Sequence, residues 1–162
     1  MNVVIIGNGI TGVSAAIRIR QLQPDWKITM ISGESEYHYS RPALMYIFMG
    51  HMSYQDTKPY ENSFWSRNDI NLVRDWVTEI DTGSKRLLMQ KLDPIYYDKL
   101  LIATGSKSNK FGWPGQDLKG VQGLYDLMDL RELYENTQGV KNAVIVGGGL
   151  IGIELAEMLH SR

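Results

Sequence analysis

The chain has 162 residues, 43% of them hydrophobic and 22% charged, which is typical of a globular protein with a core of its own. The 17 Lys and Arg residues are balanced by 18 acidic residues, which argues against a strongly basic nucleic-acid groove and a polybasic membrane patch. The chain contains no cysteine, which excludes disulfides, thiolate metal sites and a redox-active Cys-x-x-Cys pair.

The first 32 residues predict a strand, a glycine turn, a helix and a second strand. Asn2–Ile6 is a short Val- and Ile-rich run, typical of a strand buried on both faces. Apolar residues recur at helical spacing from Ile10 until Pro24, and Lys27–Ser32 is again strand-like. This order predicts one βαβ unit with a right-handed crossover.

The rest of the chain predicts further strands and helices. After a short helix at Tyr60–Asn68, the strand-like stretches are Asn71–Ile80, Arg86–Gln90, Ile95–Asp98 and Lys99–Ala103. Phe111–Gly123 is a glycine-rich connector, and Leu124–Asn136 predicts an amphipathic helix. Ala143–Val146 predicts a last strand, followed by a glycine turn and a helix from Ile151, so the opening design is repeated.

Two segments, Gly7–Gly12 and Gly147–Gly152, fit the Gly-x-Gly-x-x-Gly pattern of dinucleotide-binding turns. Each follows a predicted strand and opens a predicted helix. In such a turn the first glycine permits the bend, the second admits a pyrophosphate, and the third lets the helix pack closely. The anion lies at the helix N-terminus, where N–H groups are unpaired. A glycine-rich turn without a ligand is the alternative for both segments.

An acidic residue about 20 residues beyond the glycines binds the ribose hydroxyls in such sites. Glu34 lies at this distance, directly after the second predicted strand, and Glu36 is the second candidate. An ordinary solvated turn residue is the alternative.

Four short motifs occur in order along the chain: Val3–Gly12, Tyr39–Leu44, Tyr97–Ser106 and Val144–Ala156. Together they resemble the FAD-dependent pyridine nucleotide–disulfide oxidoreductase superfamily. The resemblance is strongest to its cysteine-free branch of rubredoxin reductases, ferredoxin reductases and the flavin part of nitrite reductase. It implies an α/β, Rossmann-like FAD/NAD(P)-binding fold with three layers, a parallel sheet and a small antiparallel meander. It further implies an FAD-binding domain over residues 1–110, and a connector and the start of a second Rossmann-type, NAD(P)-binding domain over residues 111–162.

The resemblance also implies a role for individual residues. The FAD pyrophosphate would be held by Gly7, Gly9, Ile10, Thr11 and Gly12, and the ribose by Glu34. The other residues near FAD would be Arg41 and Pro42 beside the flavin, Val77 at the adenine, and Ala103, Thr104 and Gly105 in a turn close to the cofactor. The NAD(P) pyrophosphate would be held by Gly147, Gly149, Ile151 and Gly152, and the catalytic candidate Glu154 would point toward the nicotinamide. A plain strand residue and a solvated glutamate are the alternatives for Val77 and Glu154. No metal site is expected, because the three histidines lack ligand spacing.

The implied activity is that of an FAD-dependent NAD(P)H:acceptor oxidoreductase. Hydride would pass from NAD(P)H to FAD, and electrons onward to a rubredoxin-like protein or another acceptor, protein or small molecule. Without cysteine, these residues are not expected to reduce disulfides. Met45-Tyr46 stands where ferredoxin reductases have Ser-Lys, which disfavours that assignment. The alternatives are a two-nucleotide flavin monooxygenase, disfavoured because no histidine occurs from Met52 to Leu159, and a non-enzymatic nucleotide-binding fragment.

The chain ends at Arg162, within the helix that follows the second glycine turn. The family would require further strands and a Gly-Asp segment beyond it, so we expect the N-terminal portion of a longer enzyme. On its own, the chain is expected to be inactive and to bind FAD weakly. No targeting or membrane-spanning segment is recognisable, which predicts a cytoplasmic protein without membrane or nucleic-acid partners. A homo-oligomer is compatible with the resemblance.

Overall fold

The computed structural model describes all 162 residues. The chain divides into two compact units. Unit 1 comprises Met1–Tyr39 and Lys58–Ser106, and unit 2 comprises Ser40–Thr57 and Lys107–Arg162.

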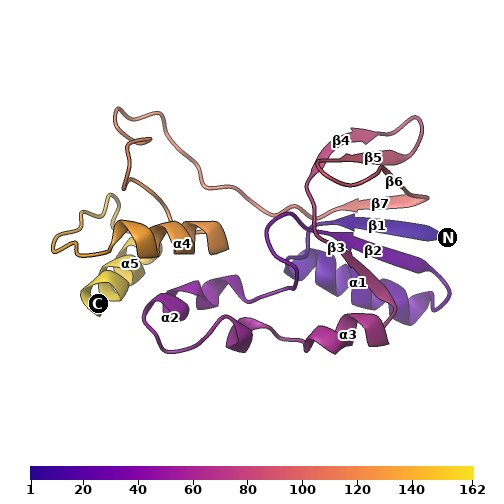
Figure 1. Ribbon diagram of the computed structural model, residues 1–162, viewed down its shortest axis with the longest axis horizontal. Coiled ribbons are helices and arrows are strands. Elements are labelled where there is room, and N and C mark those ends of the chain that lie inside the picture. The colour runs from indigo at the N-terminus through magenta and orange to yellow at the C-terminus, as the bar shows by residue number, and fades with distance from the viewer. The chain divides into compact units, whose positions relative to one another are not determined.

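Unit 1 is built on a four-stranded parallel sheet (Figure 1). Its strands are β1 (Asn2–Ile6), β2 (Lys27–Ile31), β3 (Ile70–Val73) and β7 (Lys99–Ile102), in the order β3-β2-β1-β7. Helix α1 (Ile10–Leu22) connects β1 to the adjacent parallel strand β2. The predicted βαβ unit is therefore confirmed. Because all four strands run parallel, their carboxyl ends meet at one edge of the sheet.

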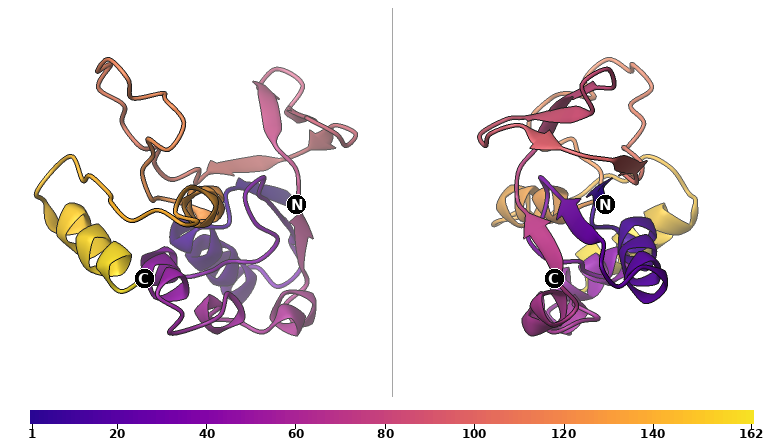
Figure 2. Two further views of the ribbon diagram at one scale, coloured as in Figure 1. Left: turned by 60° about the vertical axis from the view of Figure 1, so that its left-hand side comes forward. Right: turned by 90° about the vertical axis from the view of Figure 1, so that its right-hand side faces the viewer.

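The two faces of this sheet are covered differently. Val3 and Ile5 of β1 belong to a core with Val13 and Ala16 of α1 and with Trp65 of α3 (Asn62–Arg67). The alternate residue Val4 packs with Leu87 of a small antiparallel sheet. That sheet consists of β4 (Val77–Asp81), β5 (Arg86–Met89) and β6 (Ile95–Tyr96). Since successive side chains of a strand point to opposite faces, one parallel sheet carries helices on one side and the small sheet on the other (Figures 1 and 2). The three-layer prediction is confirmed.

The predicted single strand Asn71–Ile80 is wrong, because the structure divides it between the two sheets. Between β3 and β4, the buried carboxylate of Asp75 accepts hydrogen bonds from the N–H groups of Trp76 (2.8 Å), Lys91 (2.9 Å) and Leu92 (3.0 Å). These bonds fasten the start of β4 to the end of β5. The bend depends on partners about 16 residues away, so local strand propensity does not predict it.

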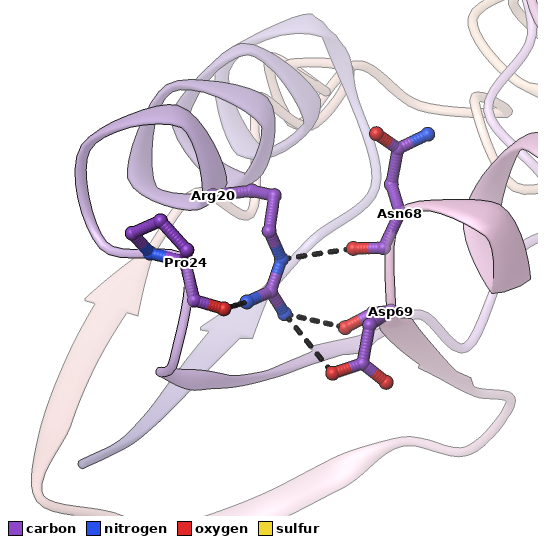
Figure 3. Close-up of polar contacts among 4 residues, drawn as sticks. All are labelled: Arg20, Pro24, Asn68 and Asp69. Carbon is purple, nitrogen blue, oxygen red and sulfur yellow. Dashed lines mark hydrogen bonds and ion pairs between the residues drawn. The ribbon is translucent and has the colours of Figure 1, made fainter.

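Arg20, near the end of α1, ties that helix to the junction of α3 and β3 (Figure 3). Its guanidinium donates to the carbonyl oxygens of Asn68 (2.9 Å), Asp69 (2.6 Å) and Pro24 (2.5 Å). The planar guanidinium group therefore supplies hydrogen-bond donors to three backbone carbonyl oxygens, each of which lies just beyond the end of a helix. The contact holds α1 and α3 on the same side of the sheet.

The regular secondary structure of unit 2 consists of helices alone. Its elements are η1 (Arg41–Ala43), α2 (Leu44–Phe48), η2 (Gln55–Thr57), α4 (Leu127–Asn136) and α5 (Leu150–His160). Helix α2 packs against both α4 and α5. Tyr134 of α4 donates its hydroxyl to the carbonyl of Ile47 (2.8 Å), and its ring lies 5.0 Å from that of Phe48. Helix α4 begins after Asp126, which forms a capping box with Asp129, so it starts later than the predicted Leu124.

The predicted strand Ala143–Val146 is wrong, since these residues adopt no regular secondary structure. No other segment of the chain pairs with them, and a strand exists only through the hydrogen-bond ladder to a neighbour. The Val144 side chain is consequently 90% exposed. The predicted connector before α4 also lacks regular secondary structure, as expected (Figure 1). None of the helices combines the length and apolar character needed to cross a bilayer.

Candidate functional site

The first glycine turn joins β1 to α1, and its three glycines differ in the space that a side chain would find. Gly7 has φ +110°, and a Cβ there would lie 2.1 Å from the carbonyl oxygen of Ala103. A Cβ at Gly12 would lie 2.1 Å from the carbonyl oxygen of Gly7, so only glycine lets α1 start this close to the strand. At Gly9, by contrast, a Cβ would meet nothing within 4 Å. This is the space that a bound group would occupy.

The N-terminus of α1 is open at this place. Gly9 is the N-cap residue, and no side chain caps the helix. The N–H groups of Ile10, Thr11 and Gly12 fall in the first turn, where a helix supplies no acceptor of its own. Ile10 and Thr11 are exposed, and no acidic side chain lies in the turn. The arrangement suits an anion, because unpaired N–H groups and the helix dipole attract negative charge.

A buried polar cluster supports the turn, and the sequence analysis missed it. The Asn8 amide donates to the carbonyl oxygen (2.9 Å) and the hydroxyl oxygen (3.1 Å) of Ser35. His38 donates from Nδ1 to the Asn8 carbonyl oxygen at 2.9 Å, so Nδ1 carries the hydrogen. All three residues are buried. They anchor the glycine turn to the loop that follows β2, over a separation that no local motif reveals.

The carboxyl edge of the parallel sheet gathers several of the predicted site residues. Glu34 follows β2 and its carboxylate accepts a hydrogen bond from the Tyr39 hydroxyl. Ala103 follows β7, and its N–H donates to the carbonyl of Ile6 at 2.8 Å, directly before the glycine turn. Thr104 and Gly105 continue from there, and Gly105 has φ +73°. Since β1, β2 and β7 are adjacent and parallel, the glycine turn, Glu34 and Ala103–Gly105 meet at one edge.

The start of β4 lies close to the same edge. The N–H of Ser32, at the end of β2, donates to the carbonyl of Val73, at the end of β3. Three residues further along the chain, Trp76 lies against Gly33, and Val77 begins β4. The buried Asp75 carboxylate fixes this bend. Burial acts to raise the pKa of Asp75, but its backbone N–H donors and the charge of Lys91 outweigh burial and lower that pKa below its usual value.

Unit 2 contains a cavity of about 270 Å³, and its lining includes four predicted site residues that come from two segments far apart in the sequence. Arg41 and Pro42 line it from η1, and Ile151 and Glu154 line it from α5. The remaining lining residues are Leu44, Met45, Leu124, Tyr125, Leu155 and Met158. Arg41 donates to the Tyr125 carbonyl (2.9 Å), and its guanidinium carbon lies 4.4 Å from the centre of the Tyr125 ring. Arg41 and Glu154 are the charged groups of this largely apolar wall.

The second glycine turn repeats the steric pattern of the first at its second and third glycines. Gly147 has φ +117°. A Cβ at Gly152 would lie 2.1 Å from the carbonyl oxygen of Gly147. Gly149 is the N-cap of α5, and a Cβ there would again meet nothing within 4 Å. The first glycines differ, because a Cβ at Gly147 would meet nothing within 4 Å whereas one at Gly7 would meet Ala103. As at α1, no side chain caps the N-terminus of α5.

Comparison with known proteins identifies the family. Residues 1–162 match the family model described as pyridine nucleotide-disulphide oxidoreductase. The chain belongs to this family. Among curated relatives, a rubredoxin-NAD(+) reductase of Pseudomonas putida is 32% identical over 158 residues, with 96% of this chain and 41% of the relative covered. An NADH-rubredoxin oxidoreductase of Clostridium acetobutylicum is 33% identical over 158 residues, with 97% of this chain and 41% of the relative covered.

The solved structures agree with this membership. The crystal structure of NADH:rubredoxin oxidoreductase from Clostridium acetobutylicum superposes with a TM-score of 0.84 at 30% identity, covering 99% of this chain and 42% of that one. The chain therefore spans about two fifths of the length of these relatives. The resemblance and the fold class stated from the motifs are confirmed. The expected cofactor pair, FAD with NAD(P)H, is that of the pyridine nucleotide-disulphide oxidoreductase family.

Proposed function

We propose that these residues form part of an FAD-dependent NAD(P)H:acceptor oxidoreductase. The observation that carries the proposal is the repeated geometry of the two glycine turns. Each begins with a glycine of positive φ, has an open glycine at the helix N-cap, and has a third glycine at which a Cβ would lie 2.1 Å from a backbone carbonyl oxygen. Two such turns in one chain fit two different nucleotide cofactors.

The FAD site would occupy the carboxyl edge of the parallel sheet in unit 1. The pyrophosphate would lie over Gly9, held by the N–H groups at the start of α1, with Gly7, Ile10, Thr11 and Gly12 forming the cradle. Glu34 would accept hydrogen bonds from the ribose hydroxyls, and Val77 would pair with adenine through its backbone. Ala103, Thr104 and Gly105 would border the cofactor from the end of β7. The residues fit FAD, because an open anion site and an acidic group share one edge.

The NAD(P)H site would lie at the start of α5. Gly147, Gly149, Ile151 and Gly152 would hold its pyrophosphate in the same way. Arg41, Pro42 and Glu154 line one cavity, which supports a role beside the reacting rings, with Glu154 near the nicotinamide. A flavin and a nicotinamide held by these residues would supply the redox chemistry, which is hydride transfer between the two rings and electron transfer to an acceptor. The apolar lining of the cavity would exclude water, and Arg41 is held in place by Tyr125.

The acceptor that we propose is a small redox protein of the rubredoxin type or another electron acceptor. Relatives whose names include rubredoxin support this choice. The chain has no cysteine, so its own residues supply no thiol for disulfide reduction. In this proposal, residues 1–110 belong to the FAD-binding domain, and residues 111–162 connect to and begin the NAD(P)-binding domain.

The test uses the complete gene product that contains these 162 residues, and two glycine variants that separate the cofactors. Gly9→Val should abolish FAD binding, measured as flavin absorbance of the purified protein, because the side chain fills the space for the pyrophosphate. Gly149→Val should retain the flavin but lose its reduction by NADH and NADPH, followed by bleaching of the flavin band. Neither position meets a neighbour within 4 Å, so the variants should fold.

Gly123→Val is the matched control, since it lies in the connector and a Cβ there would make only an ordinary 3.7 Å contact with Ser108. This variant should bind flavin, and NADH or NADPH should reduce that flavin, as in the unmodified protein. A folded, colourless gene product that takes up no added FAD would overturn the proposal. So would a Gly9→Val protein that retains its flavin.

A further inference from the structure

Trp76 is a large aromatic side chain that stays half exposed while lying directly on the main chain of Gly33. A Cβ at Gly33 would lie 2.1 Å from Cδ2, 2.2 Å from Cε2 and 2.7 Å from Cε3 of the indole. The six-membered ring therefore rests across the Gly33 Cα, in a place that only glycine leaves free. The Trp76 residue is nevertheless 52% exposed. A ring that leaves about half of its surface to solvent contributes little to the core.

The main chain on both sides of this contact is fixed. The Trp76 N–H donates to the buried Asp75 carboxylate at 2.8 Å, and its carbonyl accepts from the Gln90 N–H at 2.9 Å. The same carboxylate binds the N–H groups of Lys91 and Leu92. The ring is thus carried by a rigid bend rather than by a mobile loop. A preorganised ring loses little entropy when a planar ligand stacks on it.

The position of this ring points to an adenine. Trp76 directly precedes Val77, whose backbone we propose to pair with adenine, and it covers the residue that precedes Glu34, the proposed ribose ligand. We propose that Trp76 is an aromatic wall of the adenosine subsite and stacks on the adenine ring of the dinucleotide. The proposal rests on the function proposed above, because it requires FAD at this edge. Every base offers a π-face, so an exposed indole is suited to this contact.

The experiment titrates ADP and FAD into the flavin-free gene product and measures affinity by calorimetry and tryptophan emission. ADP carries the adenosine and pyrophosphate without the flavin. The titrations use the Gly149→Val background, in which the proposed NAD(P) pyrophosphate position is filled, so that ADP reports on the adenosine subsite of unit 1. Trp76→Leu should weaken binding of both ligands about tenfold or more, because the stacking surface is lost. Trp76→Phe should bind both within a few fold, because a phenyl ring still stacks.

Tryptophan emission supplies a readout that a purely structural role would not move. ADP should quench the emission of the unmodified protein, and this quenching should disappear in Trp76→Phe. Trp113→Phe is the matched control, since Trp113 is similarly exposed at 48% but lies in the connector of unit 2. It should retain the quenching in full.

Several outcomes distinguish this inference from the proposed function. If the unmodified protein binds neither FAD nor ADP, the proposed function fails and this inference fails with it. If Trp76→Leu folds and binds ADP and FAD like the unmodified protein, only the stacking role is overturned. If Trp76→Leu does not fold, Trp76→Phe decides, since quenching that persists in this variant arises from another tryptophan and overturns the inference.

Discussion

At the scale of single residues, the glycines of the two turns divide into two kinds. Gly9 and Gly149 face open space, whereas Gly12 and Gly152 each face a backbone carbonyl. The same sequence pattern therefore contains positions that serve a ligand and positions that serve the fold. Substitution separates them, because only the second kind should change the stability of the ligand-free protein.

Gly12→Ala should destabilise the ligand-free protein by about 1–3 kcal/mol, the usual range for overpacking. Its Cβ would lie 2.1 Å from the Gly7 carbonyl oxygen, so the start of α1 has to move away from β1. Gly9→Ala should lower the free energy of unfolding by less than about 1 kcal/mol, because alanine is a poorer helix N-cap than glycine but its Cβ meets no neighbour within 4 Å. Urea unfolding followed by circular dichroism measures both. Equal stabilities for the two variants would contradict this steric assignment.

At the scale of elements, the β4–β5 hairpin shows how one carboxylate organises a turn. The Asp81 carboxylate accepts hydrogen bonds from the Ser84 hydroxyl (2.6 Å), the N–H groups of Ser84 (3.0 Å) and Gly83 (3.1 Å), and the Arg86 guanidinium (3.1 Å). The bonds from Ser84 contribute most to lowering the pKa of Asp81 to about 2, and Arg86 adds to them. These hydrogen bonds give the turn from Asp81 to Ser84 its chemical reason.

This lowered pKa predicts how the hairpin responds to acid. A carboxyl with a folded pKa of about 2 and an ordinary pKa of 3.8 stabilises the folded state above pH 3.8. The contribution is lost as the pH falls through that interval to about 2. Asp81→Asn should therefore lower the melting temperature at pH 7, and the difference from the unmodified protein should shrink toward pH 2. Asp25→Asn, at an exposed aspartate in another turn, is the control. A difference that is the same at both pH values would contradict the prediction.

At the scale of the whole molecule, the two units differ in how their backbone is held. Unit 1 contains both sheets, whereas unit 2 contains long stretches without regular structure on either side of α4. Backbone that lacks ladder or helix hydrogen bonds opens at low free-energy cost. We expect the first proteolytic cuts in those stretches.

Brief trypsin treatment should cleave first at the exposed residues Lys107, Lys110 and Lys119 of the connector. Lys27 is also exposed but belongs to β2, where its N–H donates to the Met1 carbonyl at 3.0 Å, so it should resist longer. Mass spectrometry of the early fragments identifies the sites. Cleavage at Lys27 before the connector would show that regular structure does not protect unit 1.

Much of unit 1 could be predicted from the sequence because its signals are local. The apolar run before Gly7, the helical spacing after it and Pro24 together specify β1, α1 and its end. The two glycine turns were recognisable for the same reason, since the spacing of their glycines is a local pattern, although the neighbour that excludes a side chain at Gly7 is the distant Ala103. The order of the motifs was sufficient to indicate the family, which the comparison confirms.

Tertiary structure decided the features that depend on distant partners. The segment around Asp75 became a bend rather than a strand because its carboxylate binds N–H groups of Lys91 and Leu92. Ala143–Val146 has strand propensity, but without a neighbouring strand its backbone forms no ladder. The meeting of Trp76 with Gly33 likewise arises only when β2 and β3 pair side by side. The sequence alone thus determined the elements whose hydrogen bonds and turns close within a few residues, and the folded chain decided every contact whose energy comes from groups far apart along it.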